Sequence, residues 1–285
     1  MKQLEKGKTM RKTVGLIHGH YECRSLADTL PVFTDLLALD VVERKDKEAI
    51  VKHPNTGWRL VVHEGGPSVN DKPHNNHYGF RVANTKEIPV AWKYLEAHKE
   101  KYRIKRVYEP TEAHYAYSVY FEEPGGNTLE IEYYNPMAAA HGRTVAARHW
   151  EKLITEEQFP GRGYIPQAMS HGTLQCDDKE TSDRFYQEVL GLKIVGGGKT
   201  STYISHPAGP WYIVVLPSRH REMLSPVNRF TLRLESQEAV EETHREFGTA
   251  GKKMGITDLW DLEQTNGDVS FIFSDQDKNW WEFTS

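Results

Sequence analysis

Two segments of the chain, 77–82 and 229–234, alternate polar and apolar residues. A period of two is typical of a β-strand with one buried face. Elsewhere the apolar residues recur three or four positions apart, as in Leu26, Leu30 and Phe33. That spacing lies on one face of a helix, so the pattern predicts a chain of mixed strands and amphipathic helices.

Each of the early helices is predicted to follow a short strand. The strands cover 14–22 and 169–176, and Asp177-Asp178 after the second strand is a suitable N-cap for the next helix. Another helix is expected over 84–98, with Asn84 as N-cap and Glu87 three residues later. The chain therefore repeats the order strand, helix, strands.

The clearest local signal is a hairpin late in the first half of the chain. Residues 118–123 form an outgoing strand, the run Pro124-Gly125-Gly126-Asn127 has strong turn chemistry, and 129–134 form the return strand.

The two halves of the chain share motifs at a nearly constant separation. His18-Gly19 recurs 153 residues later as His171-Gly172, and His53-Pro54 recurs after the same interval as His206-Pro207. A constant offset over half a chain indicates duplication. We predict a tail at 1–12, module 1 at 13–135, a connector at 136–165 with a helix from Arg143 to Ile154, and module 2 at 166–285.

Composition excludes several classes of protein. The chain has 285 residues, 27% charged and 38% hydrophobic, and a net charge of −4. It has no long basic stretch, so nucleic acid is not an expected partner. It has no apolar run long enough to cross a bilayer and no signal-like N-terminus, so we expect a cytoplasmic protein with no membrane partner. Cys23 and Cys176 are expected to be free thiols.

The repeated unit resembles the vicinal oxygen chelate superfamily, which includes glyoxalases, bleomycin-resistance proteins and extradiol ring-cleaving dioxygenases. The resemblance rests on the helix ending Phe185-Tyr186 to Val189-Leu190-Gly191-Leu192 and on the Pro-Gly-Gly-Asn-x-x-Glu hairpin at 124–130. It implies an α+β fold of two tandem modules. Each module would pair two βαβββ units into a curled sheet that forms a cup.

The resemblance also implies a metal site in module 1, with His18, His77 and Glu130 as ligands. Two imidazoles and one carboxylate form the facial triad of non-haem Fe(II) oxygenases, which leaves positions open for substrate and O2. His20 competes with His18 for the first position. His18 is preferred because the second copy retains His171 there and has Thr173 at the equivalent of His20.

Further site residues are expected around this triad. Tyr120 stands ten residues before Glu130, where extradiol enzymes carry a tyrosine, and His114 is the nearest candidate for their loop histidine. Both are predicted to be catalytic. The residues expected to contact substrate are Tyr115, Tyr117, His20 and His63, the last also being a possible substitute for the family's missing acid–base histidine.

Module 2 is expected to be structural, because its equivalent positions read His171, Arg229 and Glu282. Arginine keeps its proton and cannot ligate a metal. Ile272 replaces the tyrosine, and Arg229 and Glu282 are expected to form an ion pair in place of a metal site.

The resemblance favours an Fe(II)-dependent extradiol-type dioxygenase of aromatic compound catabolism, acting on a catechol or related ortho-hydroxylated aromatic with O2. Mn(II) is a possible substitute, and a homo-oligomer is expected. Two alternatives remain open: a glyoxalase-type metal-dependent isomerase or lyase, and a non-enzymatic ligand-binding protein of the resistance type.

Overall fold

The computed structural model describes residues 12–285 except 114, 142–153, 210 and 266. It contains two open, mixed sheets of nine strands with few helices, which confirms the predicted α+β class with curled sheets. The predicted tail at 1–12, apart from Lys12, and the connector helix, apart from Ile154, lie outside the described residues. Among the described residues, no helix is both long and apolar enough to span a bilayer.

Sheet A combines strands from the start and the end of the chain. Its spatial order is β15 (Asp258–Leu259), β17 (Asp268–Ser274), β18 (Trp280–Thr284), β14 (Arg229–Leu234), β1 (Thr13–Cys23), β4 (Arg59–Glu64), β3 (Glu48–Lys52) and β2 (Asp40–Arg44), with β16 (Glu263–Thr265) beside β17.

Sheet B combines strands from the middle of the chain. Its spatial order is β11 (Lys193–Gly198), β12 (Ser201–Ser205), β13 (Tyr212–Pro217), β10 (Ala168–Cys176), β5 (His77–Arg81), β9 (Thr128–Tyr134), β8 (Ala116–Glu122) and β6 (Arg106–Val107), with β7 (Thr111–Ala113) beside β8.

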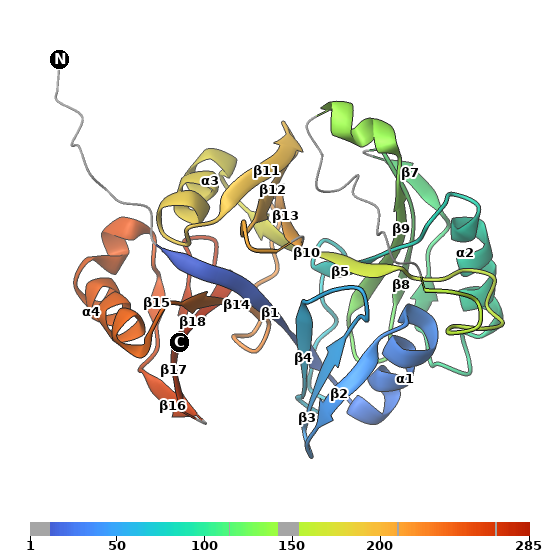
Figure 1. Cartoon of the computed structure of the whole chain (residues 1–285), viewed down its shortest axis with the longest axis horizontal. Helices are drawn as coiled ribbons and strands as arrows, with labels where there is room; N and C mark the ends of the chain where they lie inside the picture. The colour runs from blue at the N-terminus through green and yellow to red at the C-terminus, as the bar shows by residue number, and fades with distance from the viewer. Residues whose placement is uncertain (1–11, 114, 142–153, 210, 266) are drawn as a thin grey trace.

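Helices lie on both sides of this pair of sheets. α1 (Leu26–Leu37) and α4 (Gln237–Met254) contact strands of sheet A, and α2 (Glu87–Ala97) and α3 (Lys179–Glu188) contact strands of sheet B. A short 3-10 helix covers Pro136–His141. Figure 1 shows α1 and α2 at one end of the molecule and α3 and α4 at the other, with β1 running between the two ends.

The local signals in the sequence match the observed elements closely. The Asp178 carboxylate accepts from the Thr181 amide at the start of α3, as an N-cap does. α2 begins later than expected, at Glu87, although the Glu87 carboxylate accepts from the Asn84 amide in the manner of a capping box. The predicted hairpin is present as β8 and β9.

The sheets differ from the prediction in how they divide the chain. β1 pairs with β14, and β5 pairs with β10, both antiparallel. Each sheet therefore joins one unit from residues 13–135 to one unit from 166–285. The expected arrangement, in which each module curls its own two units into a cup, is not the one observed.

The repeated His-Pro turns help to hold this exchanged arrangement. The His53 Nε2 lies 3.0 Å from the Pro166 carbonyl oxygen, just before β10, and the His206 Nε2 lies 3.0 Å from the Thr13 carbonyl oxygen at the start of β1. In each turn the histidine of one half contacts the backbone of the other. The core is likewise shared, because Trp58 and Trp211 stack with ring centroids 3.5 Å apart.

Candidate metal centre

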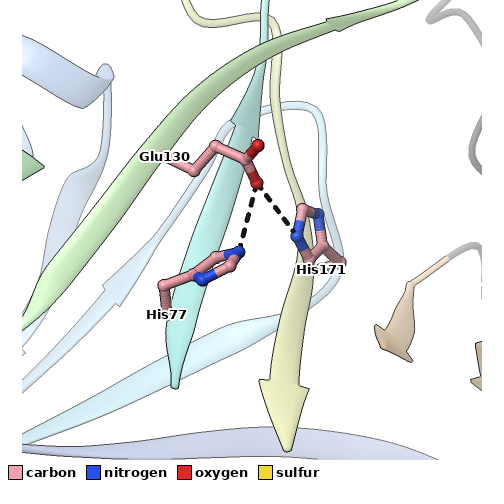
Figure 2. Close-up of side chains that lie close together, drawn as sticks. All are labelled: His77, Glu130 and His171. Carbon is pink, nitrogen blue, oxygen red and sulfur yellow. Dashed lines mark ion pairs between the residues drawn. The ribbon is translucent and has the colours of Figure 1, made fainter. Parts of the chain in front are cut away.

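Three metal-ligating side chains meet on adjacent strands of sheet B. His77 begins β5, Glu130 lies in β9, and His171 lies in β10. The His77 Nε2 is 3.2 Å and the His171 Nε2 is 3.3 Å from the same Glu130 Oε2 (Figure 2). All three side chains are buried, and their ligand atoms lie within 4.8 Å of one another. Two imidazoles and a carboxylate converge as a metal site requires.

This set corrects one of the three predicted ligands. His77 and Glu130 come together as expected, but His18 lies in β1 of sheet A and is not part of the cluster. His171 takes its place, because β5 pairs with β10 rather than belonging to a sheet with β1. Residues 166–285 therefore supply one of the three side chains, whereas the sequence predicts the whole site within residues 13–135.

A glycine on the middle strand makes room for His171. Gly79 is the strand neighbour of both His171 on β10 and Glu130 on β9. A Cβ atom at Gly79 would stand 2.1 Å from the His171 Cε1, far inside van der Waals contact. Any side chain at this position would have to displace the imidazole.

Hydrogen bonds outside the cluster orient both imidazoles. The His77 Nδ1 donates to the His74 carbonyl oxygen at 2.8 Å, and the His171 Nδ1 lies 3.2 Å from Glu132 Oε1. Arg81 in turn holds Glu132 at 2.7 Å. When Nδ1 carries the proton, the Nε2 lone pair can ligate a metal ion, which is the usual arrangement around a metal-binding histidine.

The electrostatics of the cluster also suit a cation. Burial alone lowers the pKa of His171, but the neighbouring carboxylates Glu132 and Glu130 outweigh it and raise this pKa to about 9. Burial opposes ionisation of Glu130, yet hydrogen bonds from His171 and His77 keep its pKa well below the ordinary value. The site thus holds its carboxylates ionised beside a proton that a divalent metal ion can replace. The donor set and its geometry fit such an ion.

The cluster lies at a cavity of about 200 Å³. Tyr120 lies opposite Glu130 on the neighbouring strand β8, and its ring centroid is 5.3 Å from that of His77. Burial and the Glu130 carboxylate raise the Tyr120 pKa, so the phenol stays protonated and can donate a hydrogen bond. The predicted position of Tyr120 beside the metal-type residues is therefore observed.

Strand parity decides which neighbours of Tyr120 reach the cavity. Ala116, Ser118 and Tyr120 alternate along β8 and line it. Tyr117 has the opposite parity and packs against the hydrophobic core, and Tyr115 is 41% exposed with a positive φ of 69°. Neither tyrosine is among the residues that line the cavity, contrary to prediction. His114 lies outside the described residues.

Two other predicted contacts, His20 and His63, lie in sheet A rather than at the cavity. Their rings stack, and the His20 Nδ1 is 3.0 Å from the His63 Nε2. Their predicted contact with the substrate requires β1 and β4 to lie in one sheet with β5, and the structure does not place them there. Because β1 pairs with β4 and β14, both histidines lie in sheet A, where His20 contacts Thr231 of module 2.

The expected ion pair of sheet A is confirmed. Arg229 Nε lies 3.0 Å from Glu282 Oε2, and the Thr231 hydroxyl donates to the same oxygen at 2.8 Å. The His20 Nε2 lies 2.9 Å from the Thr231 Oγ1. We call these four side chains the sheet A site.

His74 and Thr173 also line the cavity, although neither was predicted from the sequence. The His74 ring centroid lies 4.4 Å from that of Tyr120. His74 stands only three residues before His77, and this close pair of histidines is the one feature of the sequence that points to His74 as a site residue. Thr173 comes from β10 and could be found only once that strand was placed beside β5.

Comparison with known proteins supports the family that the fold and the site suggest. Residues 18–131 match the Glyoxalase/Bleomycin resistance protein/Dioxygenase superfamily, so this stretch of the chain is similar to a domain of that superfamily. A stretch of 74 residues is 36% identical to the iron-dependent extradiol dioxygenase of Rhodococcus jostii (strain RHA1). That stretch covers 26% of this chain and 21% of the relative, about a fifth of its length.

Solved structures extend the likeness to nearly the whole fold. Glyoxalase I from Zea mays superimposes with a TM-score of 0.65 at 14% identity, over 95% of this chain and 92% of that one. A putative dioxygenase from Bacillus subtilis gives 0.62 at 15% identity, over 96% and 86%. At such low identity these structures show a common fold and leave the reaction open.

Proposed function

We propose that this protein is a metal-dependent dioxygenase of the extradiol type, acting on a catechol or a related ortho-hydroxylated aromatic. The observation that carries the proposal is the buried His77–His171–Glu130 cluster at a cavity that also presents Tyr120. The similarity to an iron-dependent extradiol dioxygenase over 74 residues adds support. Fe(II) is the proposed metal, with Mn(II) as a substitute.

Each residue of the site has a proposed part in this reaction. His77, His171 and Glu130 would hold the metal from one side, and the metal would supply the redox chemistry that joins O2 to the substrate. Tyr120 would donate a hydrogen bond to a substrate oxygen. His74 and Thr173 would contact the aromatic ring or its hydroxyl groups. Both oxygen atoms would enter the product as the ring opens beside the two hydroxyls.

The test is oxygen consumption by protein loaded anaerobically with Fe(II) and supplied with a panel of catechols. We expect oxygen uptake and a coloured ring-opened product. The His77→Ala variant should lose both, because it removes a ligand, while Arg229→Ala should keep both, because Arg229 belongs to the sheet A site. No uptake by the Fe(II)-loaded protein across the panel would refute the proposal.

A glyoxalase-type isomerase or lyase is the second candidate. Two carboxylates, Glu130 and Glu132, line the cavity together with histidine, and such sites commonly combine two glutamates with histidine or glutamine. Glu132 is already held by Arg81 and Ser170, which favours the dioxygenase. Activity on an α-ketoaldehyde–thiol adduct with Ni(II) or Zn(II), independent of oxygen, would favour the second candidate.

A further inference from the structure

A second cavity, of about 410 Å³, lies on sheet A and is separate from the metal centre. Its walls are the start of β1 and the loops that lead into β4 and β13. Those two loops are the ones that carry the repeated His-Pro turns. None of its described lining residues belongs to the cluster of His77, Glu130 and His171.

The charged groups at this cavity are all positive. Arg59 on β4 and Arg233 on β14 line it from either side of β1, and no acidic residue is among the described lining residues. Neither guanidinium forms an ion pair with any part of the chain that the structure describes. Both act on His18, a third lining residue, whose pKa is lowered to about 4 by burial first and then by these arginines, against the opposing effect of Glu282.

The wall between the arginines is aromatic and carries unused hydrogen-bonding groups. Trp58 and Trp211 stack there with their planes 6° apart. Within the described residues, the indole nitrogens of both and the hydroxyl of Thr56 are buried without a hydrogen-bond partner. The three side chains are only 2–4% exposed. Burying such groups unpaired is unfavourable.

The equivalent positions of sheet B explain why Arg59 and Arg233 have no ion-pair partner among the described residues. Arg81 lies beside Glu132 on the next strand and bonds to it, whereas Arg233 lies beside Thr284, which has no charge. His171 lies beside Tyr212, whose hydroxyl accepts from Arg81, whereas His18 lies beside Arg59. Sheet A therefore has Thr284 where sheet B has the Glu132 carboxylate, and it has the Arg59 guanidinium where sheet B has Tyr212.

We propose that this cavity binds a small organic anion. Its carboxylate or phosphate group would be held by Arg59 and Arg233, since guanidinium groups bind such groups through two parallel hydrogen bonds. Its apolar body would lie against the Trp58–Trp211 pair. The cavity is too large for an inorganic anion alone to fill. This inference is independent of the proposed dioxygenase activity.

Calorimetric titration of the metal-free protein with benzoate, and with the neutral isostere benzamide, tests the proposal. We expect benzoate to bind at least tenfold more tightly than benzamide, and binding to weaken with added salt. Arg59→Gln and Arg233→Gln should each weaken benzoate at least tenfold. Both positions are exposed, so the variants should fold. Arg245→Gln, an exposed arginine on α4, is the matched control.

The His77→Ala variant separates this site from the metal centre. It should bind benzoate as the wild-type protein does, whether or not the chain consumes oxygen with catechols. Equal binding of benzoate and benzamide would refute anion recognition. Wild-type affinity in both arginine variants would refute the location, and no benzoate binding up to about 10 mM would refute the proposal as a whole.

Discussion

The metal centre of sheet B and the sheet A site occupy matching places in the two sheets. They differ at one residue of the middle strand, on β5 in sheet B and on β14 in sheet A. In sheet B, Gly79 lies between His171 and Glu130. In sheet A, Thr231 lies between His18 and Glu282, and its hydroxyl bonds to the carboxylate. The metal centre thus depends on Gly79, which is not itself a ligand. Because Gly79 has no side chain, the His171 imidazole can approach Glu130.

The two places also differ in how they balance charge. Sheet B presents His77 where sheet A presents Arg229, and the arginine pairs with Glu282 directly. A guanidinium stays protonated and keeps its ion pair with the carboxylate. An imidazole can lose its proton, so a metal ion can bind between it and the carboxylate. The same framework therefore holds a candidate metal centre on one side and a closed ion pair on the other.

The largest expected effect is on metal affinity, and it should differ between His171 and His18, the two histidines of the repeated His-Gly motif. His171→Ala should lower the metal affinity more than about 100-fold and abolish any metal-dependent activity, because it removes a ligand. His18→Ala should leave both close to wild type. Metal content after dialysis against a weak chelator measures the difference. Loss of metal in His18→Ala with retention in His171→Ala would contradict the assignment.

Replacing Gly79 with the threonine found at the equivalent position of sheet A should weaken the metal centre. Gly79→Thr places a side chain against the His171 ring, so we expect the metal affinity to fall by about 10- to 100-fold. The overpacking should also cost about 1–3 kcal/mol of unfolding free energy. Thr231→Gly is the control, since it opens the sheet A site without touching the metal centre. Unchanged metal binding in Gly79→Thr would show that His171 does not need this space.

Removing the arginine of the sheet A site should affect stability rather than metal. Arg229→Ala leaves the Glu282 carboxylate without its cation, and we expect a loss of about 3 kcal/mol, measured by urea unfolding. Arg229→Ala combined with Glu282→Gln should recover part of this loss. A double variant no more stable than the single one would mean that the arginine acts by packing.

The smallest expected effect is on the pH dependence of stability, through His20 of the sheet A site. Burial, followed by the charge of Arg229, lowers the pKa of His20 to about 3, despite its hydrogen bond to Glu282. Because the unfolded chain takes up this proton near pH 6.5, stability is present above that pH and is lost as the pH falls toward 3. His20→Gln should therefore show a smaller loss between pH 7 and 5, by roughly 1–2 kcal/mol. An identical acid profile would contradict the neutral, buried state of His20.

Much of the local structure could be predicted from the sequence because it depends on local chemistry. The turn at 124–127 and the alternation in 77–82 act over a few residues, and both appear where expected as the β8–β9 connection and β5. Alternation also places Glu130 and Tyr120 on facing positions of one hairpin. The resemblance to the superfamily, laid on these elements, then implied two of the three clustered side chains, His77 and Glu130, together with Tyr120.

By itself the sequence determined the repeated elements, the residue types available for chemistry and the loss of a histidine at Arg229. Only the tertiary structure decided which histidine joins His77 and Glu130. His18 and His171 stand in the same motif, and no local pattern states which strand will lie beside β5. Strand pairing between distant segments depends on the packing of the whole chain, including the Trp58–Trp211 stack between its halves.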